Sequence, residues 1–112
     1  MISYSVESSL MMTHTIFTDK TLKYAFDDNG INFPNLDWTI NKLEVIASCD
    51  SGIINMNTLI DELKVIASLG VSGTIAIDDD HCNHKLYRLG CGVIITFIGE
   101  VVFKVDEIIN IR

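Results

Sequence analysis

The densest group of chemically capable side chains is one short run from Asp78 to His84, which reads Asp-Asp-Asp-His-Cys-Asn-His. It offers carboxylate, imidazole and thiol groups, and two imidazoles with a thiolate are ligand types that Zn²⁺ accepts in a tetrahedral site. Structural zinc sites usually combine closely spaced ligand pairs from separate segments, and the chain has no Cys-x-x-Cys or His-x-x-x-His pair. We therefore predict a solvated turn without metal. A small metal-binding protein or enzyme that uses the His81–His84 cluster is the alternative.

Other catalytic arrangements have less support. A thiolate nucleophile at Cys82 or Cys91 would need a neighbouring histidine as its base, and no pattern in the sequence joins the two residue types. Cys49 and Cys91 are flanked by apolar residues, which is typical of small core side chains. Adjacent carboxylates such as Asp27 and Asp28 point apart on a helix or a strand. We therefore predict no catalytic residues, no cofactor and no enzymatic activity.

The charge of the chain restricts its partners. It has 15 acidic and 8 basic residues, which gives a formal net charge of −7. Nucleic acids and anionic lipids are bound by clustered Lys and Arg, so this balance disfavours direct nucleic acid and membrane binding. The same field attracts a basic protein and raises its association rate at low salt. The sequence therefore predicts a basic protein partner, although acidity also serves solubility.

Length and composition indicate a single domain over residues 1–112. A chain of this length with 48% apolar residues and one proline can bury a sizeable core. The first twenty residues lack the basic segment and unbroken apolar run of a secretory signal. Three scattered cysteines do not make a disulfide framework. These features predict a cytoplasmic protein with reduced thiols.

Two segments show the three-four spacing of apolar residues that predicts a one-sided helix. The first spans 35–49, and its apolar positions are Leu36, Ile40, Leu43, Ile46 and Ala47. The second spans 58–69 and is followed by Gly70, which suits the left-handed conformation that ends a helix. The two segments contain similar six-residue sequences, LEVIAS at 43–48 and LKVIAS at 63–68. This similarity could mark a helical hairpin, or it could be a coincidence between two segments that both pack in the core. We favour the coincidence.

After Gly70 the apolar period changes to two, which predicts strands. The expected strands are Thr74 to Asp78, Lys85 to Leu89, Val93 to Ile98 and Val101 to Val105. Their connections are too short for parallel crossovers, so we expect an antiparallel meander. Asp79 to His84 would form the first hairpin tip, Gly90-Cys91-Gly92 a tight turn or bulge, and Gly99-Glu100 a two-residue turn. Isoleucines at 108, 109 and 111 would extend the last strand or add a short one.

The first 33 residues have the weakest pattern. Thr18 to Asp28 is compatible with a short helix, and Met1 to Val6 with an edge strand. Together the elements predict an α+β fold in which two or three helices pack on an antiparallel β-meander of about four strands. The helical part would cover about 1–70 and the meander about 71–112.

The three aspartates Asp78, Asp79 and Asp80 would sit together at a hairpin tip. In size, acidity, intracellular character and this acidic tip, the chain resembles the immunity proteins of bacterial toxin systems, including those of contact-dependent growth inhibition. The resemblance implies an antitoxin, which binds and neutralises a cognate basic protein toxin, in many cases a nuclease. The acidic protein would occupy an active site lined with Lys, Arg and His as a phosphate mimic.

We expect acidic contacts with one aromatic residue. The expected partner-binding residues are Asp78, Asp79 and Asp80, with Asp27, Asp28, Asp50 and Tyr87 as weaker candidates. One alternative is a phage-type inhibitor that mimics the charge of DNA with carboxylates distributed over a face. A structural role also fits, because the alternating apolar run from Val101 to Val105 would allow a homodimer.

Overall fold

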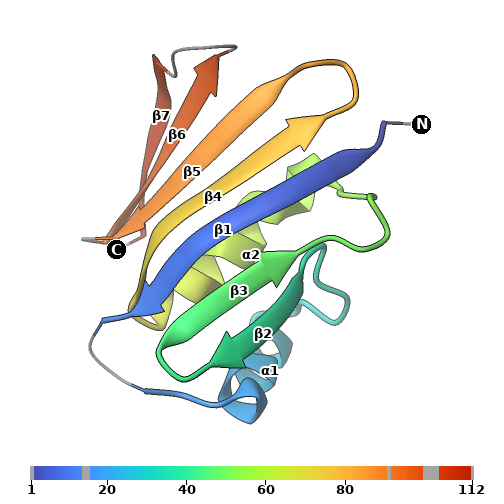
Figure 1. Cartoon of the computed structure of the whole chain (residues 1–112). Coiled ribbons are helices and arrows are strands. Elements are labelled where there is room, and N and C mark those ends of the chain that lie inside the picture. The colour runs from blue at the N-terminus through green and yellow to red at the C-terminus, as the bar shows by residue number, and fades with distance from the viewer. Residues whose placement is uncertain (1, 14–15, 91, 100–103, 112) are drawn as a thin grey trace.

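The computed structural model describes residues 2–13, 16–90, 92–99 and 104–111 (Figure 1). In these residues seven strands form one antiparallel sheet, in the order β2-β3-β1-β4-β5-β6-β7, and two helices pack against it. The elements in chain order are β1 Tyr4–Met12, α1 Asp19–Asp28, β2 Asp37–Asn41, β3 Glu44–Ser48, α2 Met56–Ser68, β4 Val71–Asp79, β5 His84–Gly90, β6 Val93–Gly99 and β7 Lys104–Asn110.

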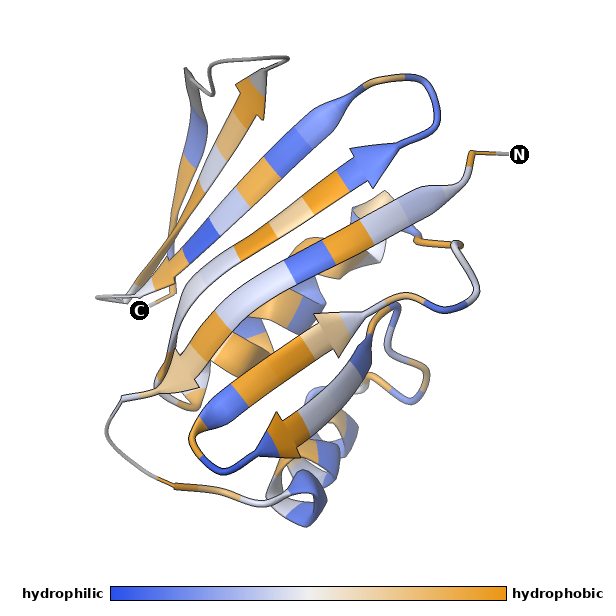
Figure 2. Cartoon of the chain, in the orientation of Figure 1, coloured by the Kyte–Doolittle hydropathy of each residue, from blue (hydrophilic) through white to orange (hydrophobic). Residues whose placement is uncertain are grey.

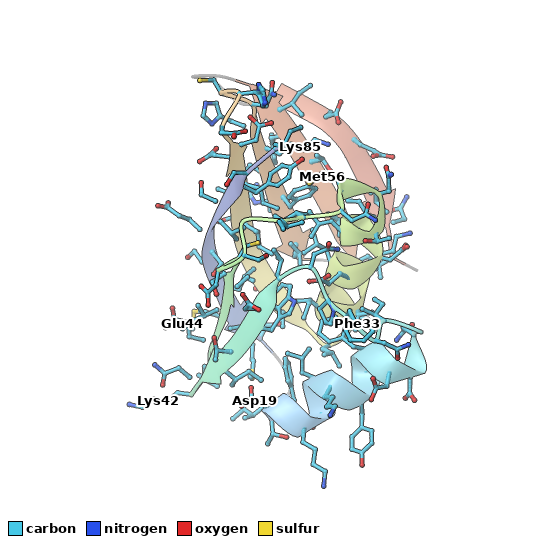
Figure 3. All side chains as sticks on the ribbon, turned by 90° about the vertical axis from the view of Figure 1, so that its right-hand side faces the viewer. Asp19, Phe33, Lys42, Glu44, Met56 and Lys85 are labelled. Atoms are coloured by element: carbon cyan, nitrogen blue, oxygen red, sulfur yellow. The ribbon has the colours of Figure 1, made fainter. Side chains whose placement is uncertain are left out.

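The sheet has one covered and one open face. Helix α2 crosses behind the sheet and α1 lies beside β2, both on the same side (Figures 1 and 3). We call this side the covered face and the opposite side, which carries no helix of the described residues, the open face. The core lies between α2 and the covered face, and its fully buried side chains include Val45, Leu59, Leu63, Ile66, Ile75 and Ile94. The strands β1 to β4 direct alternate side chains to the core and to the open face.

The expected fold class is wrong in its balance of strands and helices. The sheet has seven strands instead of about four, and the described residues contain two short helices. Three strands precede residue 70. Of the edge strand expected over Met1 to Val6, Tyr4 to Val6 form the start of β1, which lies inside the sheet between β3 and β4.

The helix expected over 35–49 is also wrong, because this segment forms the β2-β3 hairpin. Trp38 and Ile40 on β2, and Val45 and Ala47 on β3, point to the core with a period of two. The expected helix counted Leu43, which lies in the two-residue turn after Asn41, and Ile46, which points to the open face. Together with the core-facing Ile40 and Ala47, these positions imitate a helical spacing. Lys42 makes this turn with a left-handed φ of 58°, although no glycine marks it.

Other expected elements are present. The helix expected over 58–69 is α2, and the short helix near the N-terminus is α1. The first three strands of the meander are β4, β5 and β6, with a tip between Asp79 and His84. The last strand, β7, includes Ile108 and Ile109. Cys91 and residues 100–103, which belong to three expected turn or strand segments, lie outside the described residues.

Candidate functional site

The hairpin tip between β4 and β5 is organised by the carboxylate of Asp79. Its Oδ1 accepts hydrogen bonds from the backbone N–H groups of His81 (2.8 Å) and Asn83 (2.9 Å), and its Oδ2 accepts one from Asn83 Nδ2 (2.9 Å). These bonds, those from Asn83 above all, hold the pKa of Asp79 below its usual value. Asp79 thus shapes the turn, and its charge is partly satisfied within it.

The other two aspartates of the tip each face a histidine. Asp78 Oδ1 lies 2.5 Å from His84 Nδ1, directly across the β4-β5 pair. Asp80 Oδ1 lies 3.7 Å from His81 Nε2. The side chains of Asp78 and Asp80 are 46% and 49% exposed, so both carboxylates are open to a partner. In the described part of the chain no three His, Cys, Asp or Glu side chains gather to hold a metal ion.

Backbone contacts bring Asp50 to the same edge of the sheet. The N–H of Asp80 donates to Ser3 O (3.0 Å), and the N–H of Tyr4 donates to Gly52 O (2.8 Å), so β1 links the hairpin tip to the loop after β3. In that loop the N–H of Asp50 donates to Asp37 Oδ2 (3.1 Å). An acidic edge results, which consists of Asp37, Asp50, Asp78 and Asp80.

Acidic side chains continue from this edge across the open face. Glu7 on β1 and Glu44 on β3 alternate with inward-facing neighbours and are exposed. Figure 3 shows Glu44 on the side of the sheet away from α2. Strands β1 to β4 contain no Lys or Arg. This half of the open face is therefore acidic, and its other side chains are mainly Ser and Thr.

In the described residues the other half of the open face, over β5 to β7, is mainly apolar, although it also includes His84 and Arg88 on β5. Strand register places Glu7, Ala76, Leu86 and Phe97 in one row across the sheet, which changes from acidic to apolar. The next row contains Ser9, Thr74, Arg88, Ile95 and Ile108. Figure 2 shows that hydrophobic residues predominate on β6, whereas β1 alternates. Leu86, Ile95 and Phe97 are half-buried by their neighbours, and Ile108 is 57% exposed. An apolar patch thus adjoins an acidic one.

The remaining expected contacts lie elsewhere. Asp27 and Asp28 are on the last turn of α1, on the helical side of the molecule and away from the hairpin tip (Figure 1). Tyr87 lies in the core and is 1% exposed. Burial, with smaller effects from Asp106 and Tyr4, raises the pKa of Tyr87 to about 12. The ring of Tyr87 therefore does not reach the surface that a partner would touch.

Several residues of the open face escaped the sequence interpretation. Glu7, Glu44 and Asp37 are isolated acids in the sequence, and Leu86 and Phe97 resemble ordinary strand residues. One signal was available at the start of β1, where Ser5 and Glu7 alternate with Tyr4 and Val6. That alternation indicates a strand with one solvated face. The pairing of the strands joins these residues into one surface, and this pairing could not be predicted from the sequence.

Comparisons with protein-family models, with curated proteins and with solved structures found no match to this chain. Neither helix of the described residues has the length and apolarity to cross a membrane.

Proposed function

We propose that this chain is a non-enzymatic binding protein that uses the open face of its sheet to bind a basic protein. The observation that carries the proposal is the junction of an acidic half and an apolar half on one helix-free face. The apolar patch would supply the dry centre of an interface, and the acids and hydroxyls its polar rim. Sheets that have one face uncovered are normally polar there, so the apolar half calls for an explanation.

We further propose that the partner is a toxin domain with a basic active-site cleft, and that this toxin is a nuclease. In this proposal the chain acts in the cytoplasm as the immunity protein of that toxin. Such a cleft holds phosphates with Lys and Arg, which Glu7, Glu44 and Asp78 would engage. Long-range attraction would speed the encounter, and the apolar half would slow dissociation. Arg88 is the cation of the open face on β5, and its contact with a basic partner would be disfavoured.

One observation also favours a DNA-mimic inhibitor as the second candidate. The carboxylates of Asp37, Glu44, Glu7 and Asp78 come from four neighbouring strands, which is the distributed pattern that imitation of a DNA backbone requires. Such an inhibitor would block a host DNA-binding enzyme instead of a cognate toxin. Competition separates the two: a DNA mimic is displaced from its target by duplex DNA.

The test is growth of cells that express the product of the reading frame immediately upstream, with and without this chain. Rescue by the wild type, and its loss in the double variant Glu7→Lys/Asp78→Lys, would support the proposal. Asp28→Lys adds charge on the helical side and is the matched control, which should still rescue. Toxicity that the folded wild-type chain fails to relieve would contradict the toxin proposal.

A further inference from the structure

Phe33 projects from the loop between α1 and β2 and is 93% exposed. The loop is fastened on both sides of this residue. On one side the N–H of Ile31 donates to Phe26 O (2.8 Å), and on the other the backbone N–H groups of Asn35 and Leu36 donate to the Glu62 carboxylate (2.6 and 2.9 Å). A large aromatic ring held out from a fastened loop loses little conformational entropy on binding, as interface anchors do.

A groove lies next to this ring, between α1 and β2, with a volume of about 450 Å³. Its floor is apolar and consists of Leu22, Phe26, Ile31, Leu36 and Trp38. Its rim has charges of both signs, at Lys23 and at Asp19, Asp27 and Asp37. Because an apolar cavity of about 150 Å³ already admits benzene, the groove has room for a phenyl ring.

The ring and the groove share one stretch of chain, since Ile31, Asn32 and Pro34 line the groove and flank Phe33. A projection beside a matching depression is what a twofold interface needs, because each copy must supply both parts. We infer that two copies of this chain pair through this surface, with the Phe33 ring of each copy in the α1-β2 groove of the other.

The charges around the two parts agree with this pairing. Lys64 lines the same hollow as Phe33 on the other side of the loop, next to the exposed Asp61, so the lysine accompanies the ring into the interface. There it approaches the acidic rim of the second copy, at Asp27 and Asp37. This attraction opposes the general repulsion between two chains that each carry a net charge of −7. The pair should therefore be weak and should tighten when salt screens that repulsion.

The pairing shares Asp37 with the acidic edge and otherwise uses a different side of the molecule from the open face. Figure 3 places Phe33 and Glu44 on opposite sides of the molecule, so a dimer would leave both open faces free. The chain has a single tryptophan, Trp38, and it lies in the groove. Entry of a second copy's Phe33 would change the surroundings of this indole, so its fluorescence reports on this surface while the chain stays folded.

The experiment measures sedimentation and Trp38 emission of the full chain across a wide range of concentrations, up to roughly 1 mM. We expect a monomer-dimer equilibrium with a parallel change in Trp38 emission. Phe33→Ser should weaken the dimer by about tenfold or more and abolish the emission change. Ile98→Ser, which removes another exposed apolar side chain on β6, far from β2 in the strand order, should leave both unchanged.

A mixture of differently labelled copies gives a second readout by NMR, in which contacts between the Phe33 ring of one copy and the Trp38 indole of the other are expected. A chain that stays monomeric at every concentration would overturn the inference. So would a dimer that Phe33→Ser leaves intact with unchanged Trp38 emission, since assembly would then use another surface, such as the free edge of β7.

Discussion

The carboxylate of Glu62 accepts a hydrogen bond of 2.8 Å from the indole Nε1 of Trp38. Glu62 is 1% exposed, and the N–H groups of Asn35 and Leu36 also donate to it. A buried carboxylate is tolerated when hydrogen bonds replace its hydration. Through these bonds α2 holds the start of β2, and with it the loop that carries Phe33.

Glu62→Gln should therefore destabilise the protein by about 3 kcal/mol, because the new amide presents N–H donors to the donors that surround it and the charge-assisted bonds are lost. Urea unfolding followed by Trp38 fluorescence measures the change. The matched control is Asp61→Asn, which alters an exposed neighbour on α2 and should cost less than about 0.5 kcal/mol. Equal stability of Glu62→Gln and the wild type would show that these bonds contribute nothing net.

Asp79 should make the stability depend on pH at the acid end. The turn's hydrogen bonds lower its folded pKa below the ordinary 3.8, so its contribution is present above pH 3.8 and is lost as the pH falls through the folded pKa. The stability difference between the wild type and Asp79→Asn should accordingly shrink below about pH 4. Asp80→Asn, at the exposed neighbouring position, is the control. Acid titration of unfolding free energies would refute this account if both variants behaved alike.

Tyr87 should make the stability of the protein depend on pH at the alkaline end of the range. Burial raises its folded pKa to about 12 from 10.0, so the unfolded chain loses this proton first. Its contribution is fully present below pH 10 and is lost as the pH rises toward 12. Tyr87→Phe should reduce the loss of stability above pH 10, whereas Tyr24→Phe, which changes a 60% exposed ring on α1, should not. Parallel alkaline profiles for both variants would argue against a buried neutral phenol.

Gly73 should tolerate no side chain. It pairs with Leu10 in the middle of the β1-β4 ladder, with a φ of 130°, and an added Cβ would lie 2.0 Å from Ser9 O. Gly73→Ala should therefore cost about 3 kcal/mol or more, or prevent folding. Gly30→Ala is the control, because Gly30 also has a positive φ (74°) but open space around its Cβ, and it should cost about 1 kcal/mol. Thermal melting compares them; a fully stable Gly73→Ala would contradict the described β1-β4 packing.

Secondary structure was predicted best where apolar residues keep a single spacing over a long segment. Helix α2 has Leu59, Leu63 and Ile66 on its buried side, and this spacing fits no strand. The strands β2 and β3 are only five residues long, and apolar residues from the core side, the turn and the open face together imitate the helical spacing. The shared six-residue sequence makes the same point: five residues of LEVIAS form β3, whereas LKVIAS forms the end of α2. Tertiary packing decides between the two structures for such segments.

The candidate site was predictable in part. The acidic run at 78–80 lies at a hairpin tip as expected, and Asp50 joins the same edge of the sheet. Glu7 and Glu44 lie on one surface with this edge because β1 lies between β3 and β4. This is a long-range pairing for which the sequence contains no local signal. The apolar half of the open face depends likewise on the register of β5, β6 and β7.

The most direct test of the central claim is the affinity of the purified chain for the product of the reading frame immediately upstream, measured at low and at moderate salt. Glu7→Lys/Asp78→Lys should weaken binding by about a hundredfold at low salt and flatten its salt dependence, while Asp28→Lys should change the affinity by less than about threefold. Tight binding that the double variant leaves unchanged, or that Asp28→Lys impairs as strongly, would contradict a binding site on the open face.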